Sequence, residues 1–230
     1  LLAGVSVNGN AAPESSMGVV ASDFDQDGDT DLFLTHLMTE TNTLYVNDGR
    51  GSFIDASART RIAHGSVNFT GFGAGWIDVN NDGDLDLFSA NGAVSYIKEQ
   101  VIAGVDVPMR LRNQLWVNDG NGSYAEIRAG PAFELLDVSR GASFGDLDND
   151  GDVDIYSTAY FPDHFIEHSH AGGLPTGVTN FVYHDSNLGG RNILFRNDVE
   201  NDDWNFLDVT KKTGLENNNS RFSFIGSWDD

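Results

Sequence analysis

The sequence of 230 residues contains no cysteine, few basic residues and no long apolar run. The absence of cysteine excludes a disulfide scaffold, an iron–sulfur site and a thiol nucleophile, although it leaves the cellular compartment open. Because no apolar run approaches the roughly 18 residues of a membrane span, we expect no membrane insertion. Residues 1–10 also lack the charged start and cleavage pattern of a signal peptide, so we expect a processed or truncated N-terminus.

Acidic residues outnumber basic ones by 35 to 13, which makes the formal net charge -22. A surface this acidic repels phosphate backbones and anionic lipid headgroups, which argues against nucleic acid and membrane surfaces as partners. Aromatic residues make up 11% of the chain, and this favours a packed core over disorder. The length is sufficient to bury one sizeable core, in one domain or two.

The acidic residues cluster in three loops that share a nine-residue pattern. The pattern has Asp at positions 1, 5 and 9, Asp or Asn at position 3, and Gly at position 6. It occurs at residues 23–31 (loop 1), 78–86 (loop 2) and 146–154 (loop 3). Fourteen of the 35 acidic residues lie in these loops, so the negative charge is largely local.

The surroundings of the loops repeat as well. A small, Gly-rich or aromatic stretch precedes each loop and an apolar run follows it, as at residues 71–76 and 87–88. A second shared unit follows at residues 42–49, 113–120 and 192–198, and its Asp-Gly pairs are typical of tight hairpins. Each repeat therefore predicts strand, acidic loop, strand, connection, strand, hairpin and strand. This is a four-stranded antiparallel meander of the size of a β-propeller blade, so we predict an all-β fold.

We predict three blades and the start of a fourth, with acidic loops between the first and second strands. The expected bounds are 1–16 for a lead-in or edge strand from a preceding blade, 17–65 for blade 1, 66–137 for blade 2, 138–219 for blade 3 and 220–230 for the start of blade 4. Helical periodicity is nearly absent, and only residues 97–102 could form a short turn of helix. Residues 222–230 repeat the stretch that precedes a loop, so we expect a fragment of a longer chain.

Blades 2 and 3 carry insertions in the connection between their second and third strands, at about residues 92–112 and 161–191. In an antiparallel meander, this connection lies at the opposite end from the turn between the first two strands. We therefore expect the acidic loops on one face of the propeller and the insertions on the other.

The chemistry of the loops points to calcium. Like charges about 4 Å apart repel by on the order of 4 kcal/mol at an effective dielectric constant near 20, and a hard divalent cation reverses the sign of that interaction. Calcium accepts six to eight oxygen ligands in a flexible shell, here side chains from positions 1, 3, 5 and 9 and the backbone carbonyl of position 7. The expected ligands are Asp23, Asp25, Asp27, Asp29 and Asp31 in loop 1; Asp78, Asn80, Asp82, Asp84 and Asp86 in loop 2; Asp146, Asp148, Asp150, Asp152 and Asp154 in loop 3; and Asp230 in a fourth site.

Details of the pattern separate calcium loops of this kind from alternatives. Magnesium suits the loops less well because it requires a stricter octahedron and retains more water. An EF-hand needs a bidentate Glu at position 12 and flanking helices, whereas position 12 here is Leu34, Ser89 or Ser157 in a strand-like run. Asn80 leaves loop 2 with one carboxylate fewer than the other loops, so we expect it to bind calcium most weakly. The side chains at position 7 should point outward, and Gly at position 6 should permit the sharp reversal.

The blocks MGVVASDFDQDGDTDLFL, GFGAGWIDVNNDGDLDLFSANG and RGASFGDLDNDGDVDIY resemble the FG-GAP or VCBS repeats of integrin α-subunit propellers. With NTLYVNDGRGSF and NILFRND between them, the order of units looks most like cartilage acidic protein and bacterial relatives that carry ASPIC and UnbV regions. This resemblance implies a calcium-stabilised, usually seven-bladed propeller that is extracellular, on the cell surface or periplasmic. It also implies a role in adhesion or other protein contacts and the same ligand positions in all three loops.

Other residue groups have both a functional and a structural interpretation. His164, His168 and His170, with Asp163 and Glu167, could offer ligands to zinc or copper, or they could belong to a polar surface loop. The N-glycosylation sequons at Asn68, Asn121 and Asn218 matter only in a glycosylating secretory route. Trp76, Trp116, Phe72 and Phe144 could form a sugar-stacking platform, but their repeat positions favour the blade core. Arg110 and Arg112 could meet an acidic partner or be solvated.

No catalytic motif is evident: there is no nucleophile elbow, no glycine loop followed by Lys and no zincin helix. We therefore expect a non-catalytic calcium-binding module with a protein or glycan partner on the insertion face. One alternative is a metal site at the histidines, or a scaffold for a secreted hydrolase or lyase domain outside this chain. Another is a structural subunit that self-assembles into a surface layer or filament through blade edges.

Overall fold

The computed structural model describes residues 3–105, 108–160, 190–200 and 203–216. These residues form three four-stranded antiparallel sheets, each with its strands in chain order. We call them blades 1, 2 and 3. Blade 1 contains β1 (Ser16–Ser22), β2 (Asp31–His36), β3 (Thr43–Asn47) and β4 (Phe53–Asp55); blade 2 contains β5 (Gly71–Ile77), β6 (Asp86–Asn91), β7 (Gln114–Asn118) and β8 (Tyr124–Ile127); blade 3 contains β9 (Ser139–Gly145), β10 (Asp154–Ala159), β11 (Ile193–Asn197) and β12 (Phe206–Asp208). The predicted all-β fold with propeller-like blades is confirmed.

Each acidic loop joins the first two strands of a blade, as the sequence predicts. In blade 1, Ser22 pairs with Asp31, so the ninth loop residue is also the first residue of the second strand. The same pairing closes loops 2 and 3. The second shared unit forms the third strand and the hairpin after it, where Gly49 and Gly120 both have φ of 70°. These left-handed conformations favour glycine, which explains the Asp-Gly pairs.

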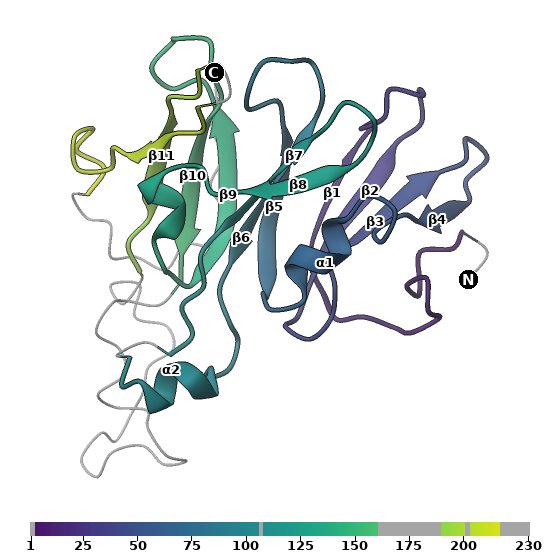
Figure 1. Ribbon diagram of the computed structural model, residues 1–230, viewed down its shortest axis with the longest axis horizontal. Coiled ribbons are helices and arrows are strands. Elements are labelled where there is room, and N and C mark those ends of the chain that lie inside the picture. Colours follow the sequence, from purple (N-terminus) through teal and green to yellow (C-terminus); the bar gives the residue numbers. More distant parts are fainter. Residues whose placement is uncertain (1–2, 106–107, 161–189, 201–202, 217–230) are drawn as a thin grey trace.

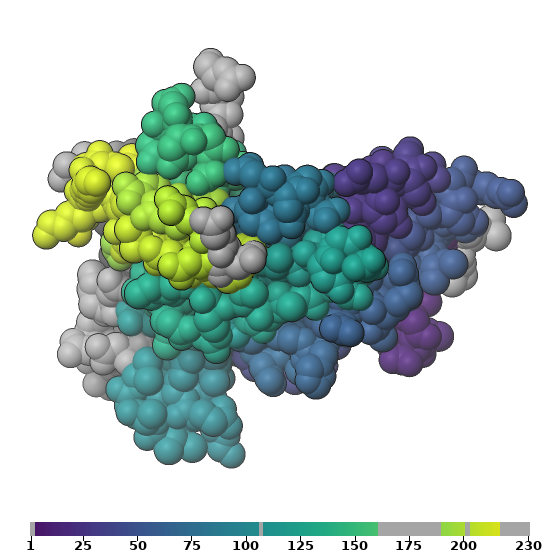
Figure 2. All heavy atoms as spheres, turned by 45° about the horizontal axis from the view of Figure 1, so that its top comes forward, coloured from purple at the N-terminus to yellow at the C-terminus, as the bar shows by residue number. Residues whose placement is uncertain are grey.

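The hydrophobic cores lie between adjacent blades. Leu87 and Trp116 pair across β6 and β7 and face blade 1, where they join a buried cluster with Phe33. Their neighbours Phe88 and Leu115 face the other way, into a cluster shared with blade 3. Blade 2 is therefore apolar on both faces, and Figure 2 shows the blades side by side in chain order.

Glycines allow the first strands of neighbouring blades to approach closely, because β1 packs against β5 and β5 against β9. A Cβ atom at Gly73 would lie 2.7 Å from the backbone nitrogen of Ala142 in blade 3. One at Gly75 would overlap with the ring of Phe144. The glycine-rich stretch before each loop is thus a packing requirement between blades.

Short helical segments occupy three of the connections. They are α1 (Ile62–Ser66), α2 (Lys98–Ile102) and the 3-10 turn η1 (Pro131–Glu134). The sequence predicted α2 but not α1 or η1, whose five and four residues show no helical periodicity. α1 and η1 carry Ile62 and Phe133 into the cores between blades. Among the described residues, no helix is long and apolar enough to cross a membrane.

The loops and the second insertion lie at opposite ends of the blades. Figure 1 shows the three acidic loops at the top and α2, which belongs to that insertion, at the bottom. This arrangement agrees with the expected separation of faces. The third insertion and the expected start of blade 4 fall almost entirely outside the described residues, and the domain bounds given above stay predictions.

Gly75→Ala should destabilise the chain by about 1 to 3 kcal/mol, because the added methyl group overpacks the contact with Phe144. Gly9→Ala is the control, since its Cβ would meet only the carboxylate of Asp55 at 3.2 Å; it should change stability by less than about 0.5 kcal/mol. Urea unfolding followed by tryptophan fluorescence measures both. Equal losses in the two variants would contradict the close packing of blades 2 and 3.

Candidate metal centre

The three acidic loops share one set of backbone hydrogen bonds. In loop 1, Asp23 accepts the N–H groups of Asp27 at 3.0 Å and Gly28 at 2.9 Å. Asp27 in turn accepts the N–H of Asp29 at 2.9 Å. The equivalent bonds in loops 2 and 3 measure 2.9 to 3.2 Å. The carboxylates at positions 1 and 5 therefore hold the loop in a tight turn.

Two positions in each loop have a left-handed backbone. The glycine at position 6 has φ between 90° and 98° in the three loops, and a Cβ there would meet no atom within 4 Å. Glycine is thus required by the backbone conformation and not by lack of space. The residue at position 4 has φ of 59°, 57° and 62° in Gln26, Asn81 and Asn149. The sequence analysis did not single out position 4, although Asn there is a signal for this conformation.

The carboxylates at positions 1, 3 and 5 converge. In loop 1 (Asp23, Asp25, Asp27) and in loop 3 (Asp146, Asp148, Asp150), each residue offers an oxygen within 4.8 Å of the other two. In loop 2, the Nδ2 of Asn80 instead donates to Asp82 Oδ2 at 2.7 Å. Three carboxylate oxygens this close repel one another, and hard divalent cations such as calcium prefer oxygen ligands. The residues present therefore fit a calcium ion in loops 1 and 3, and with a weaker donor set in loop 2.

The side chain at position 7 lies outside this group, as expected. Asp29 and Asp84 face the hairpin glycines of their own blades, Gly49 and Gly120. Asp152 accepts a hydrogen bond from Asn81 of the neighbouring loop. Position 7 can therefore contribute only its backbone carbonyl to an ion at positions 1, 3 and 5.

The carboxylate at position 9 is buried and bound to the backbone. Asp86 accepts the N–H of Val79 at 3.1 Å and the N–H of Asn118 at 2.8 Å. Asp31 and Asp154 make the equivalent pairs of bonds. Position 9 does not belong to the converging group within 4.8 Å, and its role as a ligand stays a prediction.

Burial disfavours the charged form of the carboxylate at position 9. Burial raises the pKa of Asp86 to about 7, and repulsion from Asp82 and Asp78 adds to the rise. Burial likewise raises the pKa of Asp31 and of Asp154, again with a contribution from carboxylates of the same loop. A cation near positions 1, 3 and 5 would favour the ionised form of these groups.

Sequence reasoning missed the asparagine at the end of each blade's third strand, which ties the loop to the sheet. Asn47, Asn118 and Asn197 all donate their backbone N–H to position 9. Asn197 is fully buried, and its Nδ2 also donates to the carbonyl of Val79 in blade 2 at 2.9 Å. The signal was present, because the second shared unit contains Asn-Asp in every blade.

The predicted histidine site, the glycosylation sequons and the fourth acidic loop are not tested by the structure. The histidine group with Asp163 and Glu167, Asn218 and Asp230 lie outside the described residues. Asn68 and Asn121 are exposed, and their glycosylation stays a prediction.

Trp76, Trp116 and Phe144 belong to the core, as their repeat positions predicted, and Phe72 packs against an arginine. Trp116 is 1% exposed, and Trp76 stacks on Phe24 with ring centroids 5.5 Å apart. Phe144 packs against the core between blades 2 and 3, and Phe72 lies beneath the Arg140 guanidinium, 4.0 Å from its ring centroid. These side chains are engaged within the chain, so they do not form a sugar-stacking platform.

The two arginines beside the second insertion also have partners within the chain. Arg112 forms an ion pair with Glu126 and lies 4.8 Å from the ring centroid of Phe69. Arg110 likewise interacts within the chain. Both arginines therefore interact within the chain, and neither requires an acidic partner from another molecule.

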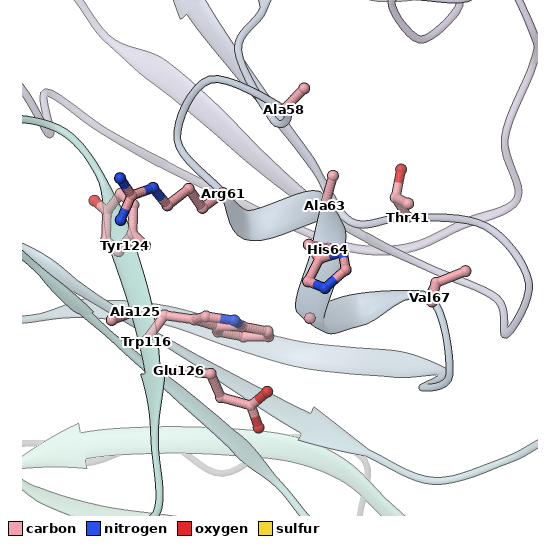
Figure 3. Close-up of a pocket in the computed structure, with 11 residues that line it drawn as sticks. Thr41, Ala58, Arg61, Ala63, His64, Val67, Trp116, Tyr124, Ala125 and Glu126 are labelled. Atoms are coloured by element: carbon pink, nitrogen blue, oxygen red, sulfur yellow. The ribbon is translucent and has the colours of Figure 1, made fainter.

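A hollow of about 790 Å³ lies between α1 and β8, at the outer seam of blades 1 and 2. Figure 3 shows His64 above the indole of Trp116, with Arg61 and Glu126 farther along the walls. The Glu126 carboxylate is paired with Arg112, and the lining side chains form no acid–base pair with one another. We assign no chemistry to this hollow.

Residues 10–89 match the family model described as FG-GAP-like repeat. This part of the chain is therefore similar to an FG-GAP-like repeat. The match spans all of blade 1 and includes loops 1 and 2, and blade 3 repeats their loop and strand order. FG-GAP-like repeats are typical of β-propeller modules that bind other proteins. A search of the curated proteins finds no match, and the narrower likeness to cartilage acidic protein stays a prediction.

Asn197→Ala should destabilise the chain by about 1 to 3 kcal/mol, because it leaves the carbonyl of Val79 and the N–H of Val199 without their partners. Asn121→Ala is the matched control: this exposed asparagine makes its side-chain bond only within its hairpin, and its loss should cost less than about 0.5 kcal/mol. Chemical unfolding of both variants measures the difference. Similar stabilities would argue against Asn197 as a link between blades.

Proposed function

We propose that the chain is a calcium-stabilised β-propeller module that binds another protein and has no catalytic activity of its own. The observation that carries this proposal is the same loop, with the same internal hydrogen bonds, at the same place in three blades. A solvated acidic turn needs no such repetition. We further propose an extracellular, cell-surface or periplasmic location, which the FG-GAP-like repeat favours.

Side chains at positions 1, 3, 5 and 9 and the carbonyl at position 7 would hold the ion in each loop. The bound ion supplies a double positive charge that offsets the repulsion among these carboxylates. Because the complete donor set exists only in the folded chain, binding adds to stability. Loop 2 would bind most weakly, since the amide of Asn80 replaces a carboxylate and already donates to Asp82.

The end opposite the loops is the proposed partner-binding surface. Large apolar side chains are exposed along the second insertion, where Ile102 is 76% exposed, Val94 50% and Val101 37%. α2 has no buried residue, so its packing within the chain does not account for these side chains. Exposed apolar patches of this kind are typical of protein-binding surfaces. Calcium would therefore stabilise the scaffold at one end while the insertion contacts a partner at the other.

Removing calcium should lower the melting temperature of a calcium-loaded sample. At a free calcium concentration of about 100 times Kd, each site adds about 2.7 kcal/mol. For a chain of this size, that corresponds to about 5 to 10 °C per site. Thermal unfolding with and without EGTA, with magnesium in excess as the control, measures the effect. An unchanged melt on chelation would refute the proposed calcium sites.

Asp25→Asn should reduce the number of tightly bound calcium ions by one, because it removes a carboxylate from the converging group of loop 1. Asp29→Asn makes the same change of charge in the same loop, but its side chain faces Gly49, so the number of ions should stay the same. Isothermal titration calorimetry gives both stoichiometries. If the two variants lose calcium equally, the ion responds to net charge and the ligand assignment is wrong.

A further inference from the structure

Side chains at position 4 of loops 1 and 2 each form a hydrogen bond with the loop of the next blade. The Nε2 of Gln26 in loop 1 donates to the carbonyl of Gly83 in loop 2 at 3.0 Å. The Nδ2 of Asn81 in loop 2 donates to Asp152 Oδ1 in loop 3 at 2.6 Å. Both bonds run in the same direction along the chain, from one blade to the following one.

Position 4 is suited to this task because its side chain is not among the converging oxygens of its own loop. Gln26 and Asn81 are exposed, have a left-handed backbone and lie outside the converging group of oxygens. The proposed calcium ligands of their own loops do not include them. Among the residues that the structure describes, the hydrogen-bond partners of these two side chains lie in the neighbouring blade.

The partners of these side chains are residues that shape the next loop. Gly83 is the left-handed glycine of loop 2, and its N–H is held by Asp78. Asp152 stands at position 7 of loop 3, the position whose carbonyl would face the ion, and its N–H is held by Asp150. A hydrogen bond to either residue restricts the turn that must form around the ion. Such preorganisation lowers the cost of ordering the loop when an ion binds.

We propose that the calcium sites are coupled in series, with Gln26 and Asn81 as positioning residues that preorganise the site of the following blade. This inference rests on the proposed function, because it presupposes that the loops bind calcium. Its consequence is specific: a change at position 4 weakens the site one blade downstream and spares the site in its own loop. The hydrogen bond and the ion in loop 3 favour each other reciprocally, so calcium in loop 3 also favours the form in which Asn81 is bonded to Asp152.

The test replaces Asn81 by glycine, which removes the side chain but tolerates the left-handed backbone. The position 6 glycines Gly28, Gly83 and Gly151 give one amide reporter for each loop in a ¹⁵N-glycine-labelled sample. During a calcium titration followed by NMR, Asn81→Gly should raise the midpoint of Gly151 by about 3- to 10-fold, the range expected for the loss of one exposed, charge-assisted hydrogen bond. The midpoint of Gly83 should change by less than about 2-fold, because the ligands of loop 2 are intact.

Three further variants separate coupling from a local effect. Gln26→Gly should shift the midpoint of Gly83 and leave that of Gly28 in place. Asn149→Gly removes the same side chain from loop 3 without touching either bond between loops, so all three midpoints should stay near the wild-type values. Asn81→Gln should restore the midpoint of Gly151, since Gln26 already spans the same kind of gap.

The outcomes distinguish this inference from the function on which it rests. If the glycine amides respond to calcium in the wild-type chain but Gly151 keeps its midpoint in Asn81→Gly, the coupling is wrong and the calcium sites stand. A shift of Gly83 as large as that of Gly151 in this variant also overturns the coupling, because the defect is then local. If no glycine amide responds in the wild-type chain, both the proposed function and the coupling fail.

Discussion

The loops and the blades both depend on the hydrogen bonds that the buried carboxylate at position 9 accepts from the backbone. Asp31, Asp86 and Asp154 each accept one N–H from their own loop and one from the end of the third strand. An exposed acidic turn is thereby tied to the interior of a sheet. Burial raises the pKa of these groups, so the fold by itself disfavours their charged form. A divalent cation near positions 1, 3 and 5 would lower these pKa values and favour the ionised carboxylates.

The second constraint is that a blade between two others buries both faces of its middle strands, so neither face contacts solvent. Blade 2 presents Leu87 and Trp116 to one neighbour and Phe88 and Leu115 to the other. Close approach of the first strands requires glycine where a methyl group would overlap with the next blade, as at Gly75. Loops that sit above these strands are therefore brought within hydrogen-bonding distance of one another, which makes contacts between sites possible.

Much of the site could be predicted because its members are local. All the converging carboxylates of loop 1 fall within five residues, Asp23 to Asp27, so spacing alone placed them together. Strand order followed from the repeat, and the hairpins followed from their Asp-Gly pairs. Two short helical segments escaped prediction: α1 and η1 show no periodic signal in the sequence, yet Ile62 and Phe133 are fully buried between blades.

The sequence by itself determined the repeat, the all-β class, the position of each acidic loop between two strands and the chemical type of its donors. These depend on residues that are near neighbours in the chain, where spacing dictates geometry. Only the tertiary structure decided what crosses between elements: the burial of position 9, its bonds to Asn47, Asn118 and Asn197, and the links from Gln26 and Asn81 to the next blade. Gln26 and Gly83 are 57 residues apart in the chain, and only the packing of blade against blade brings them together.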